Sequence, residues 1–238
     1  MDWHKAAIFG ASGGIGAALV AALAERGVPV LAGSRKGEGP GAPGVTPFAF
    51  DLTDEAGIAA AVKPWADDPP DLVIVATGVL TLPDGTGPER SFKALDAAAM
   101  ARMFALNTVG PALIAKHVLP LMPRGRPATF AALSARVGSI GDNRLGGWHS
   151  YRASKAALNM LIRNFAIETA RTHKQACVVG LHPGTVDTPL SEPFQGNLPE
   201  GQLTAPADAA SNLLRVLGDL SPEDSGGVFD WKGERIPE

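Results

Sequence analysis

The feature that most constrains the fold is an alternation of short apolar runs with helical patterns along the whole chain. Residues 71–76 read Asp-Leu-Val-Ile-Val-Ala, a nearly continuous apolar run that is typical of a strand in a parallel sheet covered on both faces. Strands that alternate with helices in this way form right-handed βαβ units and a doubly wound sheet. We therefore predict an α/β fold in which helices flank a mainly parallel sheet of about seven strands.

The patterns also set approximate bounds for the elements. We expect strands at residues 5–10, 28–33, 48–51, 71–76, 128–133, 176–181 and 226–229, and helices at 14–26, 54–66, 96–119, 150–171 and 206–217. Glycine, proline and polar residues concentrate at 36–47 and 185–205, which predicts two loops. No repeat, linker or break in composition divides the 238 residues. We therefore expect a single domain over residues 1–238, with 185–205 as a substrate loop and candidate lid.

Composition excludes several classes of protein and site. Hydrophobic residues make up 45% of the chain and charged residues 19%, as in globular rather than disordered proteins. The net charge of −3 gives no reason to expect nucleic acid as a partner. The single cysteine, Cys177, excludes an intramolecular disulfide and favours a reducing, cytoplasmic compartment. The five histidines lack paired-ligand spacing, so we expect no metal site.

An uncharged stretch near the beginning of the chain invites comparison with a membrane span or an export signal. Residues 6–24 carry no charge, which meets the length requirement for a span. However, four glycines lie in the middle of this stretch, where they would destabilise a helix. The residues before it do not form the positively charged flank of an export signal. We therefore expect no association with a membrane.

A cluster of glycines lies between the first predicted strand and the first predicted helix. Residues 10–16 read Gly-Ala-Ser-Gly-Gly-Ile-Gly, with the spacing GxxxGxG rather than GxGxxG. Glycines at this place let backbone N–H groups approach a pyrophosphate, which the helix N-terminus attracts. We interpret the cluster as the nucleotide-binding turn of a Rossmann-type domain. The alternative is a tight turn that binds nothing.

The residues after the second predicted strand bear on the choice of cofactor. This strand ends in Gly33-Ser34-Arg35-Lys36, where NAD-binding chains place an acidic residue for the ribose hydroxyls. An arginine can instead pair with the 2′-phosphate of NADP. Arg35 therefore favours NADP (NADPH) over NAD, unless it is a solvated loop charge like Lys36. Asp51 is a candidate acceptor for the adenine amino group or, equally, a turn or helix-capping aspartate.

Tyr151, the only tyrosine of the chain, lies four residues before Lys155, and this spacing puts both side chains on one face of a helix. A phenol with a pKa near 10 is a poor acid or base at neutral pH. An ammonium about 4 Å away contributes roughly 4 kcal/mol at an effective dielectric near 20. That energy would lower the pKa of the phenol to about 7, where proton transfer is efficient. By itself the spacing fits either an acid–base pair or an ordinary contact on a helix surface.

These motifs occur in the order and spacing found in the short-chain dehydrogenase/reductases, which the chain resembles over essentially its whole length. The resemblance rests on residues 10–16, Asp51, Asn107, the Ser134 region, residues 151–155 (Tyr-Arg-Ala-Ser-Lys) and residues 183–188 (Pro-Gly-Thr-Val-Asp-Thr). Within the family the chain looks most like the C-factor-like carbonyl reductases, through residues 136–143, 151–160, 182–188 and 226–233. The resemblance implies an oxidoreductase that transfers hydride between a nicotinamide and a small aldehyde, ketone or alcohol.

The family's functional residues can be carried over to positions of this chain. Tyr151 would protonate the carbonyl oxygen, Lys155 would lower the pKa of Tyr151 and hold the nicotinamide ribose, and Asn107 would anchor a water that relays protons to Lys155. The cofactor site implied by the resemblance comprises Gly10, Ser12, Gly13, Gly14, Ile15, Gly16, Arg35, Asp51, Leu52, Ala76, Gly78, Tyr151, Lys155, Pro183, Gly184, Val186 and Thr188.

The sequence departs from the family pattern at two places. Residues 75–78 read Val-Ala-Thr-Gly where the family has Asn-Asn-Ala-Gly, so two sheet-bracing side chains are missing. The family pattern Ser-x-x-Gly, aligned on Gly138, puts Ala135 where the catalytic serine is expected. Adjacent residues of a strand point to opposite sides. Either Ser134 or Ser139, not both, is therefore expected to contact the substrate oxygen, and we favour Ser134.

Two other functions compete with the reductase. A nucleotide-binding signalling or regulatory protein without significant turnover is the alternative, because the C-factor-like group is named for a developmental signal. The presence of Tyr151, Lys155 and Asn107 favours the enzyme. A sugar-nucleotide epimerase or dehydratase ranks third, because the chain after residue 185 leaves little room for a substrate domain. The resemblance also implies a homodimer or homotetramer, built on helices that flank the fourth and fifth strands.

Overall fold

The computed structural model describes residues 3–39, 41–197, 199 and 201–238. Seven parallel strands form one sheet in the order β3-β2-β1-β4-β5-β6-β9. The strands are β1 (Ala6–Phe9), β2 (Val30–Ser34), β3 (Val45–Ala49), β4 (Leu72–Val75), β5 (Ala128–Leu133), β6 (Ala176–His182) and β9 (Val228–Asp230). The strand order reverses between β1 and β4, and in open α/β sheets ligands bind at such a switch point, outside the carboxyl ends of the strands.

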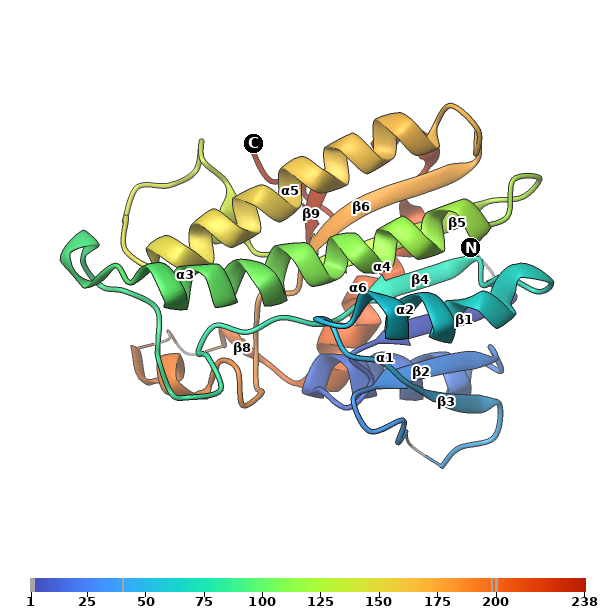
Figure 1. Ribbon diagram of the computed structural model, residues 1–238, viewed down its shortest axis with the longest axis horizontal. Coiled ribbons are helices and arrows are strands. Elements are labelled where there is room, and N and C mark those ends of the chain that lie inside the picture. The colour runs from blue at the N-terminus through green and yellow to red at the C-terminus, as the bar shows by residue number, and fades with distance from the viewer. Residues whose placement is uncertain (1–2, 40, 198, 200) are drawn as a thin grey trace.

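Helices cover both faces of the sheet (Figure 1). On one face, α1 (Gly14–Glu25) packs against α6 (Pro206–Asp219). On the other lie α2 (Glu55–Val62), α4 (Gly110–Val118) and the long α5 (His149–Thr169). α3 (Ala97–Phe104) precedes α4 and contacts α5. The predicted doubly wound, Rossmann-type α/β fold is confirmed.

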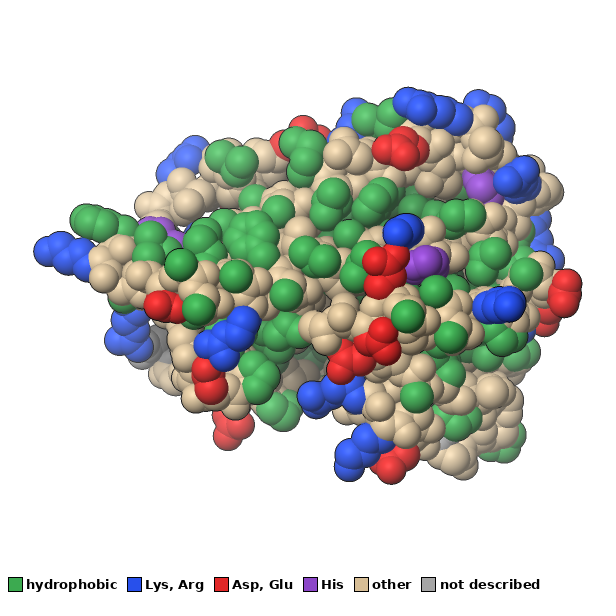
Figure 2. Space-filling view, viewed as in Figure 1, with side chains coloured by type: hydrophobic (Ala, Val, Ile, Leu, Met, Phe, Trp, Pro, Cys, Tyr) green, Lys and Arg blue, Asp and Glu red, His purple; other side chains and the backbone are tan. Residues whose placement is uncertain are grey.

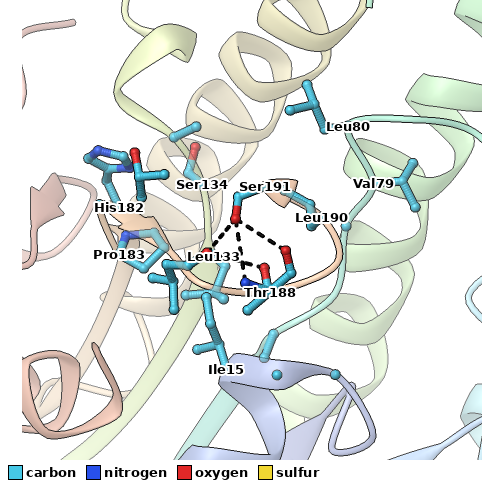
Figure 3. A pocket seen from close by; sticks show the side chains of 18 of the residues that line it. Ile15, Val79, Leu80, Leu133, Ser134, His182, Pro183, Thr188, Leu190 and Ser191 are labelled. Atoms are coloured by element: carbon cyan, nitrogen blue, oxygen red, sulfur yellow. Dashed lines mark hydrogen bonds between the residues drawn. The ribbon is translucent and has the colours of Figure 1, made fainter. Parts of the chain in front are cut away.

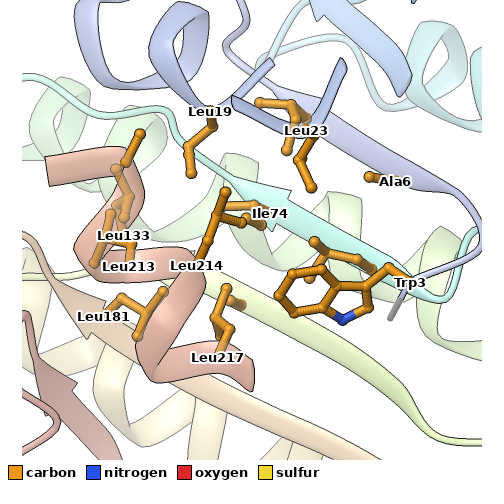
Figure 4. Packing of buried hydrophobic residues seen from close by; sticks show 14 of the residues in the cluster. Trp3, Ala6, Leu19, Leu23, Ile74, Leu133, Leu181, Leu213, Leu214 and Leu217 are labelled. Carbon is orange, nitrogen blue, oxygen red and sulfur yellow. The ribbon is translucent and has the colours of Figure 1, made fainter. Parts of the chain in front are cut away.

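The central strands contribute alternate residues to two hydrophobic cores. In β1, Ala6 and Ile8 lie in the core under α1 and α6, whereas Ala7 and Phe9 lie in the core under α2, α4 and α5. Figure 4 shows the first of these cores, in which leucines of α1 and α6 meet the strands. Because the central strands are buried on both faces, they are apolar at nearly every position. This explains the continuous apolar run over residues 71–76.

Three segments differ from the predicted bounds. β3 begins at Val45, within the predicted loop, and pairs with β2 as an edge strand, where the missing N–H of Pro47 is tolerated. A π-helical segment, Ala105–Val109, interrupts the helix predicted over residues 96–119. The predicted loop 185–205 begins and ends in two short strands, β7 (Thr185–Val186) and β8 (Leu203–Thr204), which pair in parallel. Positions 198 and 200 of this loop lie outside the described residues.

The helical stretch Ala97–Leu121 is long and apolar enough, by length and composition alone, to cross a membrane. It comprises α3, the π-helical segment, α4 and a short 3-10 turn. Ile114 and Ala115 of this stretch are completely buried in the core under α4, and Val118 is nearly so. These residues of the stretch belong to the core of the sheet.

Candidate active site

The glycine turn joins β1 to α1. At three of its positions the neighbouring atoms lie so close that only glycine fits. Gly10 has a φ of +94°, and a Cβ there would lie 2.9 Å from the carbonyl oxygen of Ala76. A Cβ at Gly16 would lie 2.1 Å from the carbonyl oxygen of Gly10, and one at Gly14 would lie 2.6 Å from Cγ2 of Thr188. The turn therefore presents bare backbone at the N-terminus of α1, which suits an anionic pyrophosphate.

A cleft of about 480 Å³ opens beside this turn. It runs from Ser12 and the start of α1, past the segments that follow β4 and β5, to residues 182–194 after β6. Figure 3 shows Ile15, Leu80 and Leu190 around the same cavity, each from a different part of the chain. The cleft thus lies at the switch point, where the topology predicts a ligand.

Tyr151 and Lys155 lie one turn apart on α5, and both line the cleft. Their exposed fractions are only 8% and 3%. The Lys155 Nζ donates a hydrogen bond to the carbonyl oxygen of Leu133 at 2.8 Å and lies 5.9 Å from the centroid of the Tyr151 ring. Burial raises the pKa of Tyr151 to about 12 and lowers the pKa of Lys155 to about 8. Both groups are therefore driven toward their neutral forms.

The direction of the Tyr151 shift corrects the prediction of a phenol pKa of about 7. That prediction placed the charged ammonium about 4 Å from the phenol in a partly aqueous dielectric. In the structure the Lys155 ammonium is bonded to Leu133, and removal of the phenol from water penalises its charged form. At neutral pH the phenol consequently holds its proton, which is the state that a proton donor needs.

Asn107 lies in the π-helical segment and is completely buried. Its Oδ1 accepts a hydrogen bond from the Val79 N–H, and its Nδ2 donates to the Val79 carbonyl oxygen, both at 2.8 Å. A Cβ added to Gly78 would lie 3.2 Å from the Asn107 Oδ1 and 3.3 Å from the Lys155 Nζ. Asn107, Gly78 and Lys155 therefore meet at one wall of the cleft. The Asn107 side chain holds the segment after β4 there.

Comparisons with known proteins identify the family. The family model of the short chain dehydrogenases matches residues 4–198. The chain belongs to the short chain dehydrogenase family. It is similar to the C-signal protein of Myxococcus xanthus, with 38% identity over 143 residues, which are 60% of this chain and 81% of that protein. It is also similar to a 1-hydroxy-2-glutathionyl-2-methyl-3-butene dehydrogenase of Rhodococcus sp. (strain AD45), with 34% identity over 92% of each chain.

Solved structures extend these comparisons. The NADPH-bound carbonyl reductase from chicken fatty liver superposes over 100% of both chains, with a TM-score of 0.85 and 26% identity. The carbonyl reductase Sniffer of D. melanogaster covers the same extent with a TM-score of 0.81 and 20% identity, a likeness of fold. The predicted resemblance to C-factor-like carbonyl reductases is confirmed, and so is the prediction of an NAD(P)-dependent oxidoreductase of the short-chain family.

Neither serine candidate of this dehydrogenase is bonded to the Tyr151 phenol. The Ser134 Oγ lines the cleft but donates a hydrogen bond to Asn159 Oδ1 at 2.6 Å. The Ser139 Oγ accepts one from the Asp142 N–H at 3.0 Å, in the turn after the cleft wall. Ala135 instead packs in one buried cluster with Tyr151. The structure thus places Ala135 in the cluster of Tyr151, while both serines are bonded to other groups; the choice of serine stays a prediction.

At the adenosine end of the dehydrogenase site, the side chains lie at the surface. Arg35 is exposed directly after β2. Asp51 is also exposed, and its Oδ1 accepts hydrogen bonds from the backbone N–H and the hydroxyl of Thr53, at 2.8 and 2.6 Å. These bonds, with a smaller contribution from Arg35, lower the pKa of Asp51. Asp51 therefore makes the bonds of a turn residue, and its contact with the adenine amino group stays a prediction. Leu52 packs under Gly110.

At the other end, residues 183–191 form a tightly hydrogen-bonded turn. Gly184 has a φ of +79° and faces the ring of Trp231, 3.1 Å from where a Cβ would lie. Ser191, which the sequence analysis did not single out, donates through Oγ to the carbonyl oxygens of Val186 at 2.5 Å and Thr188 at 3.2 Å (Figure 3). These bonds fix Thr188 opposite the glycine turn. No spacing pattern signals Ser191, because it acts on its own backbone turn.

An aromatic wall borders the cleft, which no spacing in the sequence could identify. Trp148, which precedes α5 in a left-handed conformation with φ 52°, packs edge-on to Tyr151 at 6.3 Å between ring centroids and to Phe194 at 5.2 Å. Trp148 and Phe194 come from segments far apart in the sequence, so only the folded chain reveals the contact. Across residues 3–39, 41–197, 199 and 201–238, no cluster of His, Cys, Asp or Glu suits a metal ion.

Proposed function

We propose that this dehydrogenase is an NADPH-dependent reductase of small aldehydes and ketones that also oxidises the corresponding alcohols. The observation that carries the proposal is the position of the protonated Tyr151 phenol. It lies in the same cleft as the glycine turn, one helical turn from the buried Lys155. The chicken relative of known structure is a carbonyl reductase with NADPH bound. That likeness supports the same cofactor and the same reaction here.

The cleft suits a nicotinamide nucleotide on the evidence of its own atoms. Close packing against the rest of the chain requires bare backbone at Gly10, Gly14 and Gly16, and the turn they form lies at the N-terminus of α1, which attracts an anionic pyrophosphate. Thr77 lines the cleft, and its Oγ1 is buried without a hydrogen-bond partner among the described residues. A buried hydroxyl without a partner is costly, so it fits a site that a polar ligand completes. A bound reduced nicotinamide would supply the hydride.

The residues that line the cleft or lie behind it then have separate roles in the proposed reaction. Tyr151 gives its proton to the carbonyl oxygen of the substrate, because its raised pKa keeps the phenol protonated at neutral pH. Lys155 lies beneath it, held by the Leu133 carbonyl oxygen, where its remaining N–H groups can bind ribose hydroxyls. Asn107 positions both the segment after β4 and the backbone at Gly78. Pro183, Gly184, Val186 and Thr188 would frame the carboxamide.

The preference for NADPH over NADH rests on charge at the end of β2. Arg35 and Lys36 are both exposed there, and no acidic residue occupies the two positions. The Ser34 hydroxyl is engaged with the backbone of Glu38, accepting from its N–H at 3.0 Å and donating to its carbonyl oxygen at 2.7 Å. Arg35 is thus the group that would pair with a 2′-phosphate.

The proposal includes an oligomer, because α5 and the π-helical segment before α4 present apolar side chains to solvent (Figure 2). Val109, Met160 and Ile167 are 49%, 62% and 50% exposed. A homodimer or homotetramer would cover such a surface. We also propose a cytoplasmic location without nucleic-acid or membrane partners, for which the buried thiol of Cys177 and the net charge are the support.

A regulatory protein without significant turnover is the second candidate. The similarity to C-signal and the alanine beside Tyr151 favour it. Measurements of nucleotide binding and of turnover distinguish the reductase from the regulatory protein. We would measure the affinity for NADPH beside NADH in one buffer, and then NADPH oxidation with a panel of small carbonyl compounds. The NADPH-dependent reductase requires at least tenfold tighter binding of NADPH and measurable turnover, whereas turnover with tighter binding of NADH keeps the reductase and contradicts the cofactor preference. Tight binding with no turnover on any carbonyl supports the regulatory protein, and binding of neither nucleotide contradicts both.

A further inference from the structure

We propose that Glu89 is a positioning residue that holds Trp148 as an aromatic wall for the substrate. Through Trp148 it sets the preference for carbonyl compounds that carry a ring over small open-chain ones. Trp148 lines the active-site cleft, whereas Glu89 lines a separate cavity of about 390 Å³. This inference rests on the proposed function, because it names the substrates that the same cleft would select.

The backbone at Trp148 is in a conformation that a tryptophan rarely adopts. Its φ of 52° lies in the left-handed region, and among the described residues no other residue except glycine has a positive φ. Gly146 and Gly147, directly before it, have φ values of 62° and 66°. Such strain persists only where the surrounding structure fixes the conformation, and it is concentrated at functional sites. The contacts of Trp148 therefore show what fixes it.

Glu89 makes the contacts that hold Trp148 and the start of α5. Trp148 is the N-cap residue of α5, but its side chain caps no backbone N–H. The carboxylate of Glu89, 61 residues earlier in the chain, takes this role. Its Oε2 accepts a hydrogen bond from the Ser150 N–H at 3.1 Å, and its Oε1 accepts one from the Ser150 hydroxyl. The Glu89 carbonyl oxygen also accepts a hydrogen bond from the Trp148 N–H at 2.5 Å.

These hydrogen bonds, rather than dense packing, join the segment around Glu89 to α5. Glu89 and Ser150 both line the cavity of about 390 Å³, together with Ala99 and Met103 of α3. The cavity leaves the carboxylate without close packing on that side. The bonds to Trp148 and Ser150 therefore hold the segment in place, and a carboxylate at a helix N-terminus is also favoured by the helix dipole.

The indole of Trp148 lies beside the group that would protonate the substrate. The ring centroids of Trp148 and Tyr151 are 6.3 Å apart, and the two rings meet edge-on. Phe194, from the segment after β6, meets the indole at 5.2 Å between centroids. A carbonyl oxygen that accepts the Tyr151 proton would thus have its substituents next to aromatic surface. Aromatic rings pack favourably at such distances, so a substrate with a ring should gain binding energy here.

Substrate selectivity tests the proposal. Phenylacetaldehyde and propanal both carry an alkyl aldehyde group, and only the first has a ring. Glu89→Ala should lower the ratio of their kcat/KM values, phenylacetaldehyde over propanal, by about tenfold. Glu89→Gln should keep the wild-type ratio, because its amide can bond to both Ser150 groups. Arg90→Ala, on the exposed neighbouring residue, is the matched control. A purely structural defect would lower both values and leave the ratio unchanged.

A double variant shows whether Glu89 acts through Trp148. Trp148→Ala should lower the ratio at least as much as Glu89→Ala. The double variant should then have the ratio of Trp148→Ala alone, because two changes that remove the same contact are not additive. Additive losses would overturn the proposal, and so would an unchanged ratio in Glu89→Ala with native circular dichroism. If Glu89→Ala does not fold, Glu89→Asp, which withdraws the carboxylate by one methylene, provides the same test.

A binding measurement separates this proposal from the proposed function. Phenylacetamide and propanamide match the two aldehydes in shape, and a reduced nicotinamide does not reduce amides. Calorimetry should show a preference for phenylacetamide in the wild type and Glu89→Gln that Glu89→Ala and Trp148→Ala lose. If this pattern holds while the wild type reduces neither aldehyde, the reductase is wrong and the role of Glu89 stands. If the wild type reduces both aldehydes but Glu89→Ala alters neither preference, the reductase stands and the role of Glu89 is wrong.

Discussion

Asn107 and Val79 form a reciprocal pair of hydrogen bonds, side chain to backbone, with both distances at 2.8 Å. Asn107 lies on the interrupted helix between α3 and α4, and Val79 lies just beyond β4. These bonds hold the segment after β4 in place next to Gly78, which lies close to Lys155 at the wall of the cleft. π-helical segments are often found at functional sites, and here one carries the side chain that shapes the cleft.

Asn107→Leu removes both bonds and leaves the Val79 N–H and carbonyl oxygen without partners. A buried polar group left unsatisfied costs about 1–3 kcal/mol, so we expect the free energy of unfolding to fall by roughly 2–4 kcal/mol. Affinity for NADPH should fall with it, because Gly78 is no longer held. Urea unfolding and nucleotide titration measure these effects. A variant as stable as the wild type would show that the pair contributes nothing to the wall.

Arg35→Ala tests the discrimination between cofactors. Loss of the guanidinium should weaken NADPH binding about tenfold or more, equivalent to about 1.4 kcal/mol, and leave NADH binding unchanged. Lys36→Ala is the matched control on the neighbouring exposed residue. Fluorescence titration at fixed ionic strength measures both affinities. Equal losses for the two nucleotides, or none for either, would mean that Arg35 does not read the 2′-phosphate.

The raised pKa of Tyr151 predicts opposite pH dependences for the two directions of reaction. Reduction needs the protonated phenol, which persists well above pH 7 because the pKa is about 12. Alcohol oxidation needs the phenolate, whose fraction below the pKa rises about tenfold for each pH unit. Initial rates from pH 7 to 10 should therefore rise with pH for oxidation and not for reduction. An oxidation rate that is flat over this range would contradict the assignment.

The buried position of Lys155 at the active site lowers the free energy of unfolding, because burial penalises the charged ammonium. Its pKa is about 8 in the folded chain and 10.5 ordinarily, so the unfolded chain binds more protons between these values. Stability contributed through this group must therefore rise with pH from about 8 to 10.5. Lys155→Met should be inactive yet at least as stable as the wild type at pH 7, with this advantage shrinking as pH approaches 10.5. Thermal unfolding at several pH values measures it; an advantage that grows with pH would contradict the buried ammonium.

Much of the architecture follows from sequence because it depends on local patterns. The strand predicted over residues 128–133 is β5 to the residue, since an apolar run buried on both faces has clear ends. The glycine turn was predicted at its place because only glycine tolerates those backbone contacts. The pattern predicts that β3 begins at residue 48 rather than at Val45, because Pro47 is typical of a loop. Only an edge strand tolerates this proline, and β3 is an edge strand.

The remaining features depend on contacts between distant segments. A helical periodicity continues through residues 105–109, so the π-helical segment that carries Asn107 leaves no trace in the pattern. The Trp148–Phe194 contact joins segments with no shared motif. The direction of the Tyr151 pKa shift depended on burial and on the Lys155–Leu133 bond, neither of which a four-residue spacing reveals.

The most direct test of the account is the turnover of Tyr151→Phe measured beside its affinity for NADPH. Phenylalanine keeps the ring that packs with Ala135 and removes only the hydroxyl. The account predicts that kcat for carbonyl reduction falls by about a hundredfold to ten-thousandfold while NADPH binds as tightly as to the wild type. A variant that retains its turnover with NADPH bound would contradict the role of Tyr151 as proton donor, and with it the proposed mechanism.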